Sequence, residues 1–198
     1  MRQPLTREAI ARAARQILVS EGLHAVSLRR VAAMLGVTAP ALYAHVADKR
    51  DLLQGIVGQE FDLLIQRFRA VEAKDPIERL EAQCHAYVDH ALQNQDLFRA
   101  MFLFRPELTG EQRGDSPALI NRLVDELRST MQAAQAEHRL DAADLDLAAL
   151  VLWSAVHGVV ITLLAGPPLQ IELRAALADS AITTALVGIQ HGIGVRAA

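Results

Sequence analysis

The stretch that decides the fold begins at Ser27 and ends at Leu53, and it reads SLRRVAAMLGVTAPALYAHVADKRDLL. Its apolar residues recur at helical spacing on both sides of Gly36. Glycine readily takes the positive φ that a tight turn between two helices requires. Ser27 and Thr38 are side chains of the kind that caps the first turn of a helix. The stretch therefore predicts a helix-turn-helix.

The second helix of a helix-turn-helix enters the major groove with its first residues at the base edges. The residues expected to approach bases are small: Thr38, Ala39, Pro40 and Ala41. The residues expected to reach the flanking phosphates carry a hydroxyl, an imidazole and an ammonium group: Tyr43, His45 and Lys49. Alanine and proline side chains contact thymine methyl groups but make no bidentate hydrogen bonds, so Arg29 is the residue able to read a base in that way. Ser27 completes the expected DNA-binding set.

Charge is distributed unevenly along the chain. The whole sequence of 198 residues has a net charge of −3, which by itself argues against a basic nucleic-acid-binding domain. Residues 1–50, however, contain eight Lys or Arg and three acids, a net of +5, so residues 51–198 carry a net of −8. A basic N-terminal quarter on an acidic body indicates a nucleic-acid-binding face.

Composition favours an all-α protein. The chain has 34 Ala and 29 Leu against 26 Val plus Ile, and aromatic residues make up only 4%. Ala and Leu lose little on entering a helix, whereas β-branched residues lose side-chain freedom there. Periodicity predicts nine helices, including one that starts at Asp75-Pro76-Ile77-Glu78, where a cap residue precedes Pro and Glu.

The run GVTAPALYAHVADKRDLL resembles the recognition-helix signature of the tetracycline-repressor (TetR) family of bacterial transcription regulators. The upstream run TREAIARAARQILVSEGLHAVSLRRVA resembles the preceding part of the same domain, so the similarity covers about residues 6–60. It implies an N-terminal three-helix helix-turn-helix domain (1–50) joined by a long helix to a helical effector-binding and dimerisation domain (51–198). It also implies a homodimer that binds a palindromic operator in double-stranded DNA and is released by a small ligand. A competing interpretation is a helical ligand-binding or membrane-associated protein with a coincidental helix-turn-helix.

An uncharged apolar run extends from Leu147 to Leu169, and it is long enough to span a bilayer. Polar residues and glycine interrupt it, two prolines break its end, and no Lys/Arg cluster flanks it. We therefore expect no membrane and a helix buried nearly all round, which packs on its own domain and on a partner subunit. The residues expected at that dimer interface form an apolar stripe on the last helix: Ile182, Leu186, Ile189 and Ile193.

The run Trp153-Ser154-Ala155-Val156-His157-Gly158 resembles the W…HG element of one group of TetR-family C-terminal domains. Either Trp153 and His157 line an effector cavity, or they are a core tryptophan over a hydrogen-bonded histidine. The expected pocket residues are aromatic, sulfur-containing or polar: Tyr87, Phe98, Met101, Phe102, Trp153 and His157. The expected effector is small and largely apolar or aromatic.

The sequence argues against an enzyme. It contains neither a G-x-S-x-G elbow nor a dinucleotide fingerprint, and the neighbouring Cys84 and His85 diverge on a helix. One cysteine excludes a disulfide scaffold and a thiolate zinc site, and we expect no metal and no cofactor. The N-terminal residues do not form a secretory signal, so we expect a cytoplasmic protein.

Overall fold

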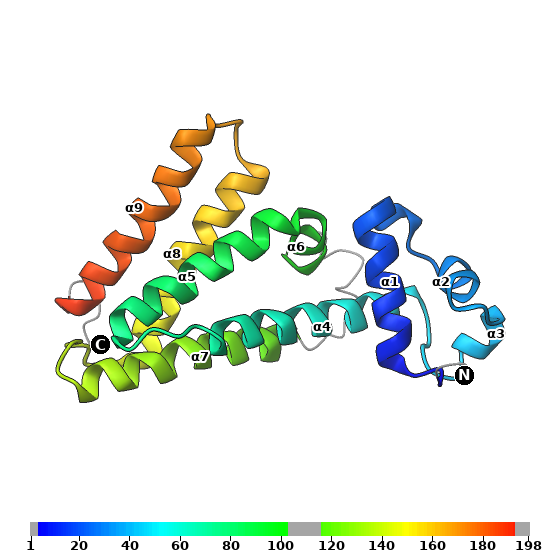
Figure 1. Cartoon of the computed structure of the whole chain (residues 1–198), viewed down its shortest axis with the longest axis horizontal. Helices are drawn as coiled ribbons and strands as arrows, with labels where there is room; N and C mark the ends of the chain where they lie inside the picture. The colour runs from blue at the N-terminus through cyan, green and yellow to red at the C-terminus, as the bar shows by residue number, and fades with distance from the viewer. Residues whose placement is uncertain (1–3, 103–115, 193–198) are drawn as a thin grey trace. The chain divides into compact units, whose positions relative to one another are not determined.

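The computed structural model describes residues 4–102 and 116–192, and within these ranges it contains helices joined by turns and loops and no strand. Nine α-helices and one short 3₁₀-helix follow one another (Figure 1): α1 (Arg7–Glu21), η1 (Leu23–Ala25), α2 (Leu28–Leu35), α3 (Ala39–Leu42), α4 (Lys49–Arg69), α5 (Pro76–Gln93), α6 (Gln95–Phe102), α7 (Ser116–Ala136), α8 (Leu145–Ala165) and α9 (Ile171–Gln190). The predicted all-α fold is confirmed.

Side-chain caps explain where most of these helices begin. The hydroxyl oxygens of Thr6 and Ser27 accept hydrogen bonds from backbone N–H groups in the first turns of α1 and α2. The carboxylate of Asp75 accepts from the backbone N–H of Ile77 at 2.8 Å, and Asp144 accepts from two N–H groups at the start of α8. Each cap satisfies donors that the first helical turn leaves unpaired.

Contacts divide the chain into two compact units. The first unit combines Met1–Leu63 with Asn94–Leu119, and the second combines Leu64–Gln93 with Ile120–Ala198. The long helix α4 therefore contributes residues to both units. The predicted domain boundary at residue 50 stays a prediction.

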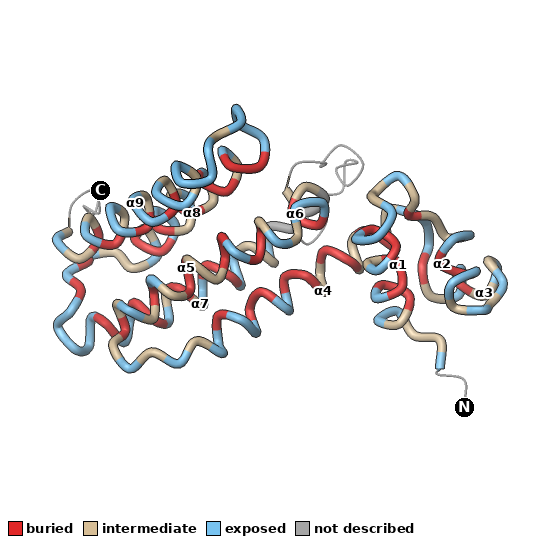
Figure 2. The backbone as a smooth tube through the Cα atoms, turned by 45° about the horizontal axis from the view of Figure 1, so that its top comes forward, coloured by how far each residue is buried: buried red, intermediate tan, exposed pale blue. Residues whose placement is uncertain are grey.

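The first unit has a core to which α1, α2, α3 and the first part of α4 contribute. Ile17, Val31, Leu42 and Ile56, one from each helix, are at most 1% exposed. Figure 2 shows buried segments along α1 and α4. These side chains come from the apolar positions that the periodicity of the sequence selects.

The second unit contains α5, α7, α8 and α9, and α8 packs against both α5 and α9. Helix α8 is the one described helix that is long and apolar enough to cross a membrane, and 44% of its most apolar window is buried inside the protein. Length and composition alone are weak evidence for a membrane span, because core helices pass the same test. Burial of residues such as Leu152 and Val160 fits the predicted core helix.

Helix α3 ends at Leu42 although the apolar pattern continues to Val46, which is buried after a turn. Helix α7 ends at Ala136, and His138 has a positive φ of 56° just beyond its end.

Candidate DNA-binding surface and ligand site

The helix-turn-helix has the predicted turn geometry. Gly36 lies in the left-handed region (φ 64°, ψ 33°), and its N–H donates to carbonyl groups at the end of α2. An added Cβ at Gly36 meets no atom within 4 Å, so the constraint there is the backbone conformation itself. The turn sets α3 directly after α2, and the two helices pack against each other.

Around α3, several expected DNA-binding side chains point into solvent. Thr38, Pro40, Tyr43 and Lys49 are exposed, and Tyr43 is exposed by 58% although it is an aromatic residue. The Thr38 side chain makes no capping hydrogen bond, contrary to the sequence-based expectation, so its hydroxyl faces outward. Ala39, Ala41 and His45 are half-buried beside them. Their contact with DNA stays a prediction.

The two adjacent arginines of α2 have different surroundings. Arg30 donates to Glu21 through Nε at 3.3 Å and through an Nη atom at 2.7 Å. These hydrogen bonds lower the pKa of Glu21 and raise that of Arg30. Arg29 is exposed, and it makes no ion pair within residues 4–102 and 116–192. Its guanidinium therefore differs from that of Arg30, which an acid of the same unit engages.

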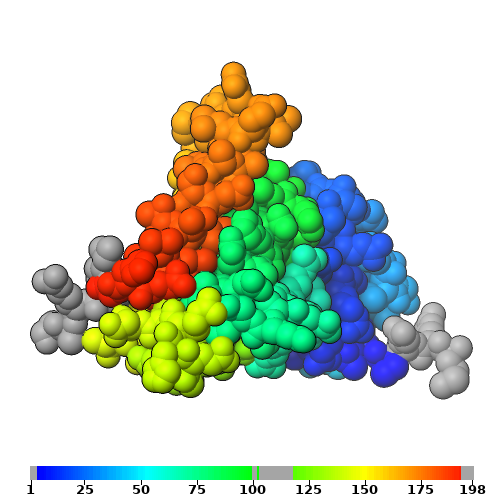
Figure 3. Space-filling model, turned by 60° about the vertical axis from the view of Figure 1, so that its left-hand side comes forward, coloured from blue at the N-terminus to red at the C-terminus, as the bar shows by residue number. Residues whose placement is uncertain are grey.

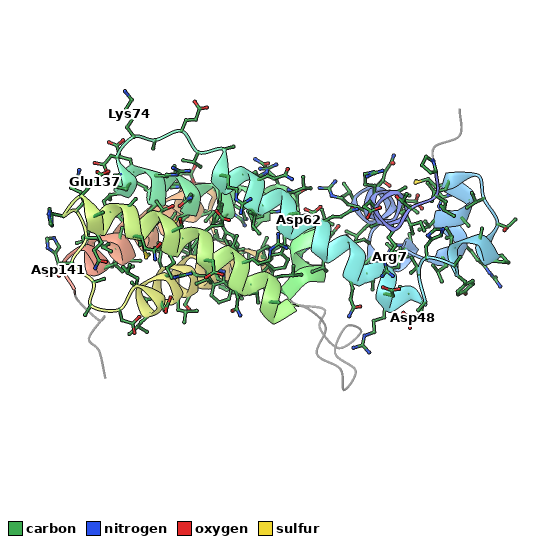
Figure 4. The ribbon with its side chains drawn as sticks, turned by 90° about the horizontal axis from the view of Figure 1, so that it is seen from below. Arg7, Asp48, Asp62, Lys74, Glu137 and Asp141 are labelled. Atoms are coloured by element: carbon green, nitrogen blue, oxygen red, sulfur yellow. The ribbon has the colours of Figure 1, made fainter. Side chains whose placement is uncertain are left out.

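Polar contacts tie α1 to α4. Arg7 pairs with Asp51, Arg15 pairs with the fully buried Glu60, and the Gln59 amide donates to the carbonyl of Glu8 at 3.0 Å. Figure 4 shows Arg7 and Asp48 in the region where α4 begins. The sequence analysis did not identify these pairs, because their partners lie more than forty positions apart. Part of the positive charge of the N-terminal quarter is thus neutralised inside its own unit.

In the second unit, Tyr87 of α5 meets Trp153 and His157 of α8. The Tyr87 hydroxyl and His157 Nδ1 are 2.7 Å apart, a hydrogen-bond distance. The rings of Trp153 and His157 stack with centroids 4.7 Å apart and an interplanar angle of 14°. Burial raises the pKa of the Tyr87 phenol, so the phenol stays protonated at neutral pH.

Gln83 lies one helical turn before Tyr87 and is a polar residue that the sequence analysis missed. Only 2% of Gln83 is exposed, and its Nε2 donates to the carbonyl oxygen of Phe68 in α4 at 3.3 Å. Within the described residues, Gln83 Oε1 and Trp153 Nε1 are buried atoms without a hydrogen-bond partner. Buried polar atoms in this state are uncommon in proteins, and each requires an explanation, such as a bound water, an ion or another molecule.

A family comparison now identifies the chain. A model described as tetracyclin repressor-like, C-terminal domain, matches residues 80–185, which is more than half of the sequence. A model described as bacterial regulatory proteins, tetR family, matches residues 10–56. The chain belongs to the TetR family.

Individual relatives agree with this assignment. An uncharacterized HTH-type transcriptional regulator of Mycobacterium tuberculosis is 28% identical over 187 residues, which are 91% of this chain and 80% of the relative. A protein of unknown function from Rhodococcus shares the fold with a TM-score of 0.74 at 23% identity, over 95% of this chain and 97% of that one. The regulator RolR, solved with resorcinol, has a TM-score of 0.68 at 17% identity, over 90% of this chain and 86% of its own.

The predicted pocket residues of this TetR-family chain fall into two groups. Tyr87, Trp153 and His157 come together in the second unit. Phe98 and Phe102 belong to the first unit, where Phe102 meets Phe61 of α4 edge-on at 5.7 Å between ring centroids. The side chain of Met101, also predicted for the pocket, lies outside the described part of the structure. The helix α6 aromatics therefore help to pack the DNA-binding unit.

The predicted dimer stripe on α9 requires a correction. Ile182, Leu186 and Ile189 are at most 4% exposed within a single chain, because they pack into the core of the second unit. They have almost no surface to offer a partner. Ile193, the fourth predicted interface residue, lies outside the described residues. Sequence periodicity located an apolar face but did not reveal what covers it.

Metal and nucleophile chemistry find little support in the described residues. No group of three or more His, Cys, Asp or Glu side chains in residues 4–102 and 116–192 is arranged to hold a metal ion. Burial raises the pKa of the Cys84 thiol to about 12, which keeps it protonated at neutral pH.

Proposed function

We propose that this TetR-family protein is a repressor that binds a palindromic operator as a homodimer and that a small, largely apolar effector releases it. The observation that carries the proposal is the exposed surface around α3, with Thr38, Pro40, Tyr43 and Lys49 in solvent and Arg29 exposed on α2. Exposed cations contact phosphates and an arginine reads guanine, which is what binding in the major groove requires. In this proposal, residues 1–50 bind DNA in the cytoplasm.

The outer surface of the α8–α9 pair supports a homodimer. Leu173 and Val187 of α9 are 53% and 45% exposed, and Val151 and Gly158 of α8 are also exposed. Figure 3 shows α9 along the surface of the molecule, uncovered over much of its length. Exposed apolar and small residues on two adjacent helices suit a four-helix interface between two-fold related chains. We assign the interface to this exposed face instead of the buried stripe.

Residues 51–198 would then bind the effector as well as the partner. The Tyr87, Trp153 and His157 cluster supports an effector site, because it combines aromatic surface with hydrogen-bonding groups in a buried place. RolR, which shares the fold, was solved with the small phenol resorcinol. Effector action requires that the ligand binds the two conformations of the protein with different affinity.

Helix α4 supports a coupling between effector binding and DNA binding. Its residues belong to both compact units, and the Phe68 carbonyl near its C-terminal end accepts the hydrogen bond from Gln83. A displacement of α4 on effector binding would therefore reach the helix-turn-helix through the α1–α4 ion pairs.

Selection of bound fragments from genomic DNA, followed by gel shifts at several salt concentrations, tests the proposed function. We expect log affinity to fall linearly with log salt, with a slope of about −0.9 per phosphate contacted. Half-sites about 34–36 Å apart, or multiples of that distance, are expected for a two-fold dimer. Absence of a shift on every genomic fragment at low salt would refute the proposal and favour a helical ligand-binding protein without DNA affinity.

A further inference from the structure

One buried face of α5 carries a row of polar side chains. Gln83, Tyr87 and His90 follow at spacings of four and three residues, and each is at most 3% exposed. Such spacing places side chains above one another on one helical face. An apolar core gains nothing from polar groups there, because burying them costs free energy unless they are hydrogen-bonded. Tyr87 has a partner in His157, whereas one amide atom of Gln83 has none within the described residues, so Gln83 is the member of the row that can accept a hydrogen bond from a ligand.

The amide of Gln83 has a defined orientation. Its Nε2 donates to the Phe68 carbonyl oxygen at 3.3 Å. The reversed amide would bring two oxygen atoms together, so the observed orientation is the favourable one. As a result Oε1 is directed away from α4, buried and without a partner. Gln83 thus offers a hydrogen-bond acceptor with a fixed position.

Trp153 offers the complementary donor. Stacking on His157 fixes the indole ring, and the hydrogen-bond distance between His157 and the Tyr87 hydroxyl fixes the imidazole in turn. The indole N–H approaches the Tyr87 hydroxyl and counteracts part of the rise in the phenol pKa that burial causes. Nε1 is buried, and no hydrogen bond of full geometry satisfies it within the described residues.

We propose that Gln83 and Trp153 recognise a neutral hydroxyl group on the effector, an inference that rests on the effector site proposed above. A hydroxyl group donates one hydrogen bond and accepts others, so it suits both an amide oxygen and an indole N–H. Neither partner requires an ionised ligand. Tyr87 follows Gln83 by one turn of α5 and is in contact with His157, on which Trp153 stacks.

Burial favours a neutral ligand over an anion. The cluster of Gln83, Tyr87 and Trp153 contains no cationic side chain, and a carboxylate placed in such surroundings loses its hydration without gaining a counter-charge. The nearest cation along this face of α5 is Arg79, one turn before Gln83, whose Nε is also buried without a partner. A carboxylate ligand that binds more tightly than the alcohol would therefore point to Arg79 and contradict the proposal.

The intrinsic fluorescence of Trp153 provides a direct assay, because it is the one tryptophan of the chain. The full-length protein is titrated with 1-octanol, with heptyl methyl ether of equal size, and with octanoate. The ether accepts a hydrogen bond but cannot donate one to Gln83. We expect octanol to bind about three- to tenfold more tightly than the ether, which is the contribution of one neutral hydrogen bond, and octanoate to bind most weakly.

Gln83→Met separates recognition from packing. Methionine keeps the length of the side chain but has no amide, so we expect the preference for octanol over the ether to disappear. Gln135→Met is the matched control, since the Gln135 amide donates to the Ala142 carbonyl at 2.9 Å, away from α5. This control is expected to keep the wild-type preference.

The affinity of the wild-type protein for octanol relative to the ether decides the proposal even if Gln83→Met does not fold. Equal affinities for the two ligands, or no fluorescence change up to the solubility limit of octanol, overturn it. A Gln83→Met variant that folds and keeps the preference also overturns it. Operator binding by the wild-type protein is measured in parallel by gel shift. If the wild type does not bind DNA, the proposed function is refuted. If it binds DNA but binds octanol and the ether with equal affinity, only the hydroxyl recognition is refuted.

Discussion

Replacement of Arg15 by methionine will remove the cation that accompanies a fully buried carboxylate. Glu60 has no exposed surface, and the Arg15 side chain that pairs with it across α1 and α4 is 30% exposed. Loss of one partner of a buried pair typically costs about 3–5 kcal/mol. Because Arg15 is partly hydrated, we expect the lower end, about 3 kcal/mol. For a chain of this length that corresponds to a fall in Tm of about 6–12 °C.

Urea and thermal unfolding followed by circular dichroism measure this loss. Arg15→Met combined with Glu60→Met removes both charges and keeps similar volume, so the double variant is expected to return to within about 1 kcal/mol of the wild type. Arg12→Met is the matched control, since Arg12 is exposed on the same helix and its loss should change stability by less than about 0.5 kcal/mol. If Arg15→Met is as stable as Arg12→Met, or the double variant is no more stable than Arg15→Met, the pair does not secure α1 to α4.

Three further outcomes are expected. Arg29→Ala should cost about 1–3 kcal/mol of operator binding and relax the specificity at one operator position, whereas Lys49→Ala should weaken binding to all sequences alike and reduce the salt slope by about 1. If Arg29→Ala loses equal affinity for operator and random DNA, Arg29 does not read a base. Val187 is exposed, so Val187→Asp should give a folded monomer in size-exclusion light scattering. Ile189 is buried, so Ile189→Asp should unfold the protein and reduce its helical circular dichroism. A folded, dimeric Val187→Asp protein would exclude the proposed interface. The pKa of Asp75 is lowered chiefly by backbone N–H groups at the start of α5, so the stabilisation by Asp75 is full above about pH 4 and is lost as pH falls through the lower folded-state pKa. The difference in unfolding free energy between the wild type and Asp75→Asn should therefore shrink from pH 7 to about pH 2. A constant difference would count against this linkage.

Local chemistry explains why the helices were predictable. A capping serine before α2, a glycine with positive φ after it, and the Asp75-Pro76 start of α5 act through neighbours within a few residues. The same locality explains the errors. Thr38 has the side chain of a cap, yet it makes no capping bond, and α3 ends earlier than its apolar pattern.

The candidate sites were less predictable because their partners are distant in sequence. Periodicity identifies Ile182, Leu186 and Ile189 as one apolar face, but burial within the same subunit or against a partner produces the same pattern. Aromatic residues such as those of α5, α6 and α8 are likewise typical of ligand pockets, but the sequence does not state which of them lie together. Only three-dimensional contacts assign Phe102 to the first unit and Tyr87 to the second.

By itself, the sequence determined the helical class, the helix-turn-helix and its turn, because spacing, caps and glycine conformation are properties of short segments. It also determined that the N-terminal quarter is basic. Only the tertiary structure decided which of those charges pair with acids: Arg7, Arg15 and Arg30 do so, whereas Arg29 and Lys49 are exposed and make no ion pair within the described residues. Ion pairing depends on distance in space, which the order of residues along the chain does not state.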